Sequence, residues 1–184
     1  MARSTPSTVV IKHHALPIGS ADFISIPLET VMIQVVEGNL ITAFQNDEIN
    51  FMAHCCNMQN VMGAGIAKQI KKAFPEAYIA DINWFHTKKD KREHSHLSLA
   101  RIETDKYICN VYGQEHFGTF KKQLNEDFLR LGLMQLADLT DSGDTIGLPY
   151  GMGCGLAGGD WNVVYQIIED VFIRLHNVKI YQLR

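Results

Sequence analysis

The sequence predicts a three-layer α/β/α fold, in which helices cover both faces of a mixed sheet of about six strands. Its 184 residues are a one-domain length. From residue 32 onward, short apolar runs alternate with segments whose apolar residues recur every three or four positions, which indicates strands alternating with helices. Glycine-rich stretches follow two of the predicted strands, where ligands bind in open α/β sheets.

The first patterned segments are two strands and two helices. Residues 32–36 form a short apolar run that ends before Gly38, and residues 49–56 are apolar at nearly every position, as expected of a buried central strand. A helix is predicted over 63–74 because Ile66, Ile70 and Phe74 recur every fourth residue. Pro75 ends this helix and opens the next, which runs to about residue 86.

The second half continues the alternation after a charged, histidine-containing loop. A turn at Thr104 and Asp105 separates two apolar runs and predicts a hairpin. Helical spacing then indicates two long helices, and a buried strand lies between them. The elements expected here are strands 97–103 and 107–112, helix 119–139, strand 145–149, a helix from Trp161 to about residue 175, and strand 178–183.

Residues 1–31 differ from residues 32–184, which we take as the domain. The first segment holds three of the five prolines and shows only weak apolar periodicity. This segment has three interpretations: an extension of unknown role, an edge strand, or an artefact of the assigned start site. The last would place the native start at Met32, which begins the first strongly patterned segment.

Composition narrows the class of protein. A hydrophobic content of 46% with 20% charged residues excludes disorder, and a net charge of -3 gives no general attraction for polyanions. The four cysteines form no zinc-like pair, which favours reduced thiols in a cytoplasmic protein. The sequence contains no apolar stretch of membrane-spanning length and no apolar signal core. We therefore expect a cytoplasmic monomer that does not bind membranes.

Two glycine-rich loops predict a site for a diphosphate. Residues 61–67 follow the strand at 49–56, and residues 150–159 follow the strand at 145–149. A phosphate needs converging backbone N–H groups, and glycine lets the chain approach it closely. The first loop also opens a helix, whose N-terminus attracts an anion. Tight turns are the alternative explanation, and neither loop is a Walker or Rossmann motif in its usual context.

Three segments resemble those of macrodomains, in the right order across residues 32–184. They are Val36-Glu37-Gly38-Asn39-Leu40, then Ala53-His54-Cys55 with Met62-Gly63-Ala64-Gly65-Ile66-Ala67, and Gly153-Cys154-Gly155-Leu156-Ala157-Gly158-Gly159-Asp160-Trp161. The resemblance is closest to the branch that groups ADP-ribose-1″-phosphate-processing proteins with small ADP-ribosyl-glutamate hydrolases. It implies that the ligand is ADP-ribose or a derivative, with no cofactor and no metal.

The resemblance also implies which residues bind this ligand. The first segment would flank the adenine, with the Asn39 amide oxygen accepting from its amine, and Asn57 would lie near the distal ribose. The two glycine loops would wrap the diphosphate, and Tyr150 or Tyr112 could pack against a sugar. The expected binding residues are Gly38, Asn39, Leu40, Asn57, Gly63, Ala64, Gly65, Ile66, Tyr150, Gly151, Met152, Gly153, Cys154, Gly155 and Leu156.

Catalysis by the lysine of the glutamate-hydrolase branch is improbable. The positions of that lysine and of its assisting aspartate correspond to Gln114 and Ala157, which can neither attack a ribose nor move a proton. Hydrolysis would then use a positioned water. The catalytic candidates are Asn57, His54 and Asp160, with Gln114 and His116 as further members of the group.

Each candidate also has a purely structural interpretation. His54 fits a hydrogen-bonded core residue, Asp160 a helix N-cap and His116 a loop histidine. The cluster His86, His94 and His96 lies among lysines and an arginine that would oppose a metal cation, so it is interpreted as a solvated loop.

The function predicted from these patterns is hydrolysis of ADP-ribose 1″-phosphate to ADP-ribose and phosphate, without a metal. One alternative is a binding module that recognises or sequesters ADP-ribose, which the missing lysine and aspartate favour. Another is removal of ADP-ribose from a macromolecule, which would make an ADP-ribosylated protein or nucleic acid the partner.

Overall fold

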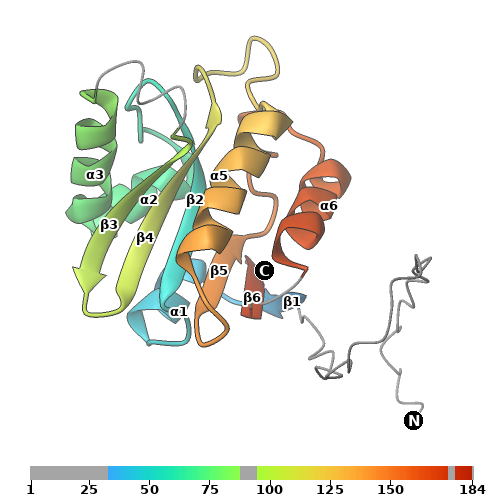
Figure 1. Ribbon diagram of the computed structural model, residues 1–184. Helices are drawn as coiled ribbons and strands as arrows, with labels where there is room; N and C mark the ends of the chain where they lie inside the picture. Colours follow the sequence, from blue (N-terminus) through green and yellow to red (C-terminus); the bar gives the residue numbers. More distant parts are fainter. Residues whose placement is uncertain (1–32, 88–94, 174–176, 184) are drawn as a thin grey trace, which may run out of the picture.

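The computed structural model describes residues 33–87, 95–173 and 177–183, and shows one mixed sheet with helices on both faces (Figure 1). The strand order is β1-β6-β5-β2-β4-β3, with β3 antiparallel to β4 and the other pairs parallel. The predicted α/β/α fold with a mixed sheet of about six strands is confirmed. The strands are β1 (Ile33–Glu37), β2 (Phe51–Asn57), β3 (Leu97–Glu103), β4 (Lys106–Gln114), β5 (Thr145–Pro149) and β6 (Asn177–Gln182).

Five helices occur in the described residues: α1 (Leu40–Gln45), α2 (Gly65–Ala73), α3 (Pro75–Phe85), α5 (Glu126–Leu139) and α6 (Trp161–Phe172). The helices α5 and α6 cover one face of the sheet, and α1, α2 and α3 cover the other (Figure 1). The strand β2 serves both faces, since Phe51 and Ala53 pack with the α5 and α6 side while Met52 packs with the α1 side. This alternation is the two-residue period of a strand buried on both faces.

Two helices differ from the prediction. The helix α1 was not predicted, because its six residues are too few to show a helical period. The predicted start of α5 at about Thr119 is wrong, since the helix begins at Glu126. Asn125 caps it by accepting from the N–H groups of Asp127 and Phe128. Of the apolar residues that extended the helical spacing, Phe120 is exposed in a loop, and Leu124 is buried but forms an isolated bridge with Gln114.

The hairpin at Thr104 and Asp105 is confirmed, with Glu103 paired to Lys106 and Asp105 at a φ of 57°. The expected extension at residues 1–31 lies outside the described residues. No helix in the described part of the chain has the length and apolar character of a membrane span.

Replacing Asn39 with alanine is expected to lower the free energy of unfolding by about 1 kcal/mol. The Asn39 side-chain oxygen accepts from the N–H groups of Ile41 and Thr42, at 2.9 and 3.2 Å, and caps α1. Urea unfolding followed by circular dichroism measures the change. Asn39→Ser, which can cap the helix again, is the matched control and should restore most of the loss; equal losses in both variants would exclude the cap as the cause.

Candidate functional site

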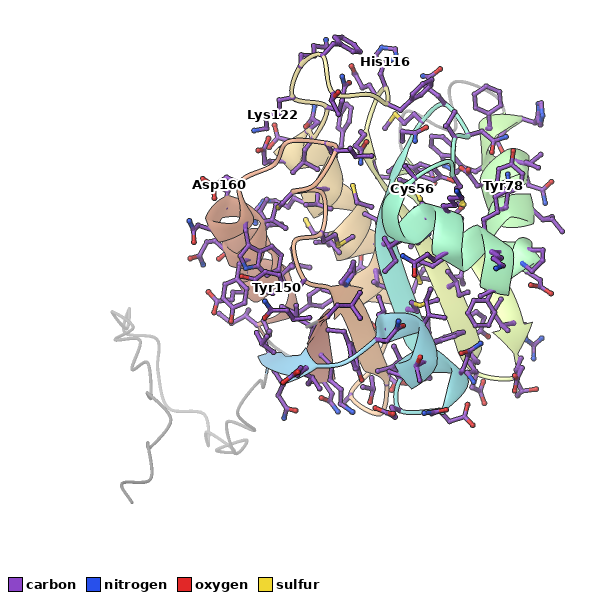
Figure 2. All side chains as sticks on the ribbon, turned by 180° about the vertical axis from the view of Figure 1, so that it is seen from behind. Cys56, Tyr78, His116, Lys122, Tyr150 and Asp160 are labelled. Carbon is purple, nitrogen blue, oxygen red and sulfur yellow. The ribbon has the colours of Figure 1, made fainter. Side chains whose placement is uncertain are left out.

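A cavity of about 730 Å³ lies at the carboxyl ends of the parallel strands. It crosses the sheet from Gly38, after β1, past Tyr150, after β5, and Asn57, at the end of β2, to Gln114, at the end of β4. Figure 2 labels two of the lining residues, Tyr150, which follows β5, and Cys56, in β2. A volume of this size accommodates a ligand as large as a dinucleotide fragment.

The first glycine loop brings the N-terminus of α2 to the cavity. Its N-cap is Ala64, which has no side-chain acceptor, and the first turn holds no acidic residue. The first N–H groups of a helix have no intrahelical partner, and Gly65 and Ile66 at this end of α2 line the cavity, so this end can bind an anion there. Gly65 opens the helix at a φ of +54°, in the left-handed region that favours glycine.

The second glycine loop contains two kinds of glycine. Gly151 and Gly155 would have nothing within 4 Å of an added Cβ, so their backbone borders open space at the cavity. Gly153 and Gly159 instead pack on Leu124, which an added Cβ would approach to 2.7 and 2.3 Å. The loop therefore has a packed side that holds its shape and an open side that can receive a ligand.

Fourteen of the fifteen residues expected to bind the ligand line this cavity, and Cys154 does not. The Cys154 thiol turns back onto the Met152 carbonyl oxygen at 3.3 Å, and burial raises its pKa to about 11. Asn39 also lines the cavity, where its side-chain oxygen accepts from the two N–H groups that cap α1. Ligand contact itself stays a prediction.

Asn57 lines the cavity and also holds its own loop together. Its Nδ2 donates to the Val61 carbonyl oxygen at 2.8 Å, and its Oδ1 accepts from the N–H groups of Gln59 and Val61 at 3.1 and 3.3 Å. The amide thus shapes the segment that leads into the first glycine loop. One Nδ2 hydrogen remains available for a ligand.

The positions of His54 and Asp160 argue against the catalytic roles expected for them. His54 is completely buried, outside the cavity lining, and its ring bonds the Asn110 side-chain oxygen at 2.8 Å. Burial lowers its pKa to about 4, so it is neutral at pH 7. Asp160 caps α6 by accepting from the Asn162 N–H at 2.8 Å and does not line the cavity.

The other residues considered for catalysis or sugar contact differ in whether they line the cavity. Gln114 and Ala157, the positions that correspond to the lysine and aspartate of the glutamate hydrolases, both line the cavity. His116 is exposed on its loop and does not line it. Tyr112 is completely buried against Trp84, with ring centroids 3.6 Å apart, so its expected contact with a sugar is wrong.

Sequence reasoning missed one acidic residue of the cavity, Asp81. This residue of α3 is 1% exposed and lines the cavity, while its Oδ1 accepts from the Tyr112 hydroxyl at 3.0 Å. Burial raises its pKa to about 6, against the opposing effects of the Tyr112 hydrogen bond and of Lys71. No sequence signal marks it, because an aspartate within an amphipathic helix is ordinarily solvated.

No group of three or more potential metal ligands occurs in the described ranges of the chain. Of the histidine cluster, His86 is exposed, His96 is buried and His94 lies outside the described residues.

The chain is similar to several known proteins. It is 27% identical over 158 residues to an uncharacterized 17.5 kDa protein of enterobacteria phage T4, which spans 80% of this chain and 95% of that protein. The macrodomain of Mycobacterium tuberculosis DarG superposes with a TM-score of 0.65 at 24% identity, over 82% of this chain and 97% of the other. Thermosipho africanus DarTG, solved in complex with ADP-ribose, superposes at 0.62 with 19% identity, over 84% of this chain and 42% of the other.

No model of a known protein family matches the chain. The two solved structures nevertheless superpose on this chain over 82% and 84% of its length. This chain has the macrodomain fold.

Proposed function

We propose that this protein binds ADP-ribose in the cavity and hydrolyses ADP-ribose 1″-phosphate to ADP-ribose and inorganic phosphate. The observation that supports this most directly is that both glycine loops line one cavity. Gly63 and Gly65 lie at the N-terminus of α2, and Gly151 and Gly155 contribute open backbone to the same cavity. Two anion cradles that face one space suit a diphosphate better than a single phosphate.

The direction of the ligand follows from the resemblance to macrodomains. Its adenine would lie at the β1 and β6 end, beside Gly38, and its distal ribose would lie near Asn57 at the end of β2. The structure of Thermosipho africanus DarTG, which superposes on this chain, was solved in complex with ADP-ribose. With Gln114 and Ala157 in place of a lysine and an aspartate, the reaction here uses water as the nucleophile.

The first experiment is calorimetric titration with ADP-ribose, beside a phosphate-release assay on ADP-ribose 1″-phosphate. We expect micromolar binding, about -8 kcal/mol, together with measurable phosphate release. AMP and ribose 5-phosphate, which each carry one phosphate, serve as matched ligands and should bind more weakly. Equal affinity for AMP would argue against a diphosphate site, and binding without phosphate release would remove the phosphatase function.

A binding module is the second candidate, and one observation favours it. Two of the three residues expected to be catalytic, His54 and Asp160, lie outside the cavity. Tight ADP-ribose binding without turnover of ADP-ribose 1″-phosphate or of an ADP-ribosylated protein or oligonucleotide would identify such a module. Turnover of one of the macromolecular substrates alone would identify a hydrolase that removes ADP-ribose from it.

A further inference from the structure

A buried carboxyl group lies at the end of the cavity where the reacting end of the ligand is expected. Asp81 of α3 lines the cavity together with Asn57 and Gln114. The cavity crosses the sheet from Gly38 to this end, in the order of the strands β1, β6, β5, β2 and β4. A ligand with its adenine beside Gly38 therefore directs its distal ribose and 1″ substituent toward Asp81.

A chain of hydrogen bonds ends on this carboxyl group. The Asn110 oxygen can only accept, so His54 Nε2 donates to it at 2.8 Å. Asn110 Nδ2 donates to Ser98 Oγ at 2.9 Å, and Ser98 Oγ lies 2.8 Å from the Tyr112 hydroxyl oxygen. Because Tyr112 donates its only proton to Asp81, Ser98 donates to Tyr112. Asn110 Nδ2 also donates to the Ala77 carbonyl oxygen at 2.9 Å, but each link of the chain from His54 to Tyr112 is donated in the direction of Asp81, which stabilises its negative charge.

Among Asp81 and the titratable groups around it, Asp81 is the one whose charge changes near neutral pH. Burial raises the pKa of the Cys56 thiol of β2 and of the Tyr112 hydroxyl of β4, so both stay protonated. Lys71 of α2 is the cation that acts on Asp81, and it favours the carboxylate. Burial outweighs these effects and sets the Asp81 pKa at about 6, so the carboxylate predominates at pH 7.

We propose that Asp81 is a catalytic residue of this site, the general base that takes a proton from the attacking water. The proposal rests on the proposed hydrolysis of ADP-ribose 1″-phosphate. Tyr112 holds Oδ1, while Oδ2 makes no hydrogen bond within the described part of the chain, which leaves it to accept a proton from a water in the cavity that Asp81 lines. A general base whose pKa lies just below the working pH is mostly ionised and still has a high affinity for the proton that it must take up.

The step balances without a metal or a co-reactant. The water oxygen bonds to phosphorus while one water proton passes to Asp81 Oδ2. The bond from phosphorus to the 1″ oxygen breaks, and its electron pair stays on that oxygen, which takes a proton from solvent. Asp81 then releases its proton to solvent, and the products are inorganic phosphate and ADP-ribose.

Asp81→Asn is the direct test, because asparagine keeps the shape and can still accept from Tyr112. We expect kcat for phosphate release to fall about 100-fold, with KM and ADP-ribose affinity within about twofold of the wild type. The matched control is Glu76→Gln, an exposed acidic residue of the same helix that does not line the cavity, and it should leave kcat unchanged.

The pH profile separates a base from a structural residue. Since the base must be ionised, kcat of the wild type should rise with pH through about 6, the pKa of Asp81. Tyr112→Phe removes the hydrogen bond that lowers this pKa, so its profile should shift to higher pH. Asp81→Asn should lack the transition altogether.

Three results would overturn the assignment. Wild-type kcat in Asp81→Asn excludes the general base, whatever the function. If Asp81→Asn fails to fold, an unshifted profile in Tyr112→Phe excludes it instead. Binding of ADP-ribose by the wild type without any phosphate release means that the proposed function has failed, and the role of Asp81 falls with it.

Discussion

Gly63→Asp is expected to weaken ADP-ribose binding about 100-fold, a loss of about 3 kcal/mol. Gly63 lines the cavity at the first glycine loop, just before the N-terminus of α2. Two like charges about 4 Å apart repel by about 1 kcal/mol in water and about 4 kcal/mol near a protein surface. A carboxylate beside the diphosphate would therefore offset most of what the helix N-terminus contributes.

The fold should tolerate this change, which separates binding from stability. An added Cβ at Gly63 meets Val61 Cγ1 at 3.7 Å, an ordinary contact, and the glycine does not have a positive φ. Calorimetric titration measures the affinity, and thermal unfolding measures stability. Gly63→Asn, with the same shape and no charge, should lose about tenfold or less. Equal losses for both variants would assign the effect to bulk, and no loss in either would place the diphosphate elsewhere.

Gly132→Ala is expected to destabilise the protein by about 2 to 3 kcal/mol, although alanine is favoured over glycine in a helix by about 1 kcal/mol. Gly132 lies in the middle of α5, where the helix packs on β4. An added Cβ would lie 2.5 Å from the His96 carbonyl oxygen and 2.7 Å from Val111 Cγ1. That carbonyl accepts from the Tyr112 N–H at 2.9 Å, so it cannot move without loss of the hydrogen bond.

Urea unfolding gives the change in the free energy of unfolding for Gly132→Ala. Asp138→Ala, at an exposed position of the same helix, is the matched control and should change stability by no more than about 0.5 kcal/mol. A more stable Gly132→Ala would mean that helix propensity outweighs the contact and that α5 can move away from the sheet.

The long elements could be predicted because their pattern is local. The strand at 145–149 has the same bounds in the sequence and in the structure, and the helix that starts at Pro75 begins where its proline requires. The helix α1 escaped prediction because six residues show no period, and the sequence did not mark Asn39 as its cap. The early start assigned to α5 arose because Phe120 and Leu124 extend its spacing into a loop.

In the candidate site, the glycine loops could be predicted from the sequence and the positions of the titratable side chains could not. Glycine marks places where the backbone turns tightly or approaches a ligand, so both loops could be located from residue types alone, and both line the cavity. The identity of a titratable residue does not show whether its side chain reaches a cavity. His54 and Asp81 are each unremarkable in sequence, yet one is buried away from the cavity and the other is buried beside it.

The sequence by itself determined the α/β alternation, the mixed sheet and the two glycine loops at the strand ends, because periodicity and glycine act over a few residues. Only the tertiary structure decided which side chains share the cavity. The packing of α3 against the sheet brings Asp81 within hydrogen-bond distance of Tyr112, 31 positions further along the chain, and removes it from water. Burial and distant partners set the charge of such a group, and neither is encoded in its neighbours along the chain.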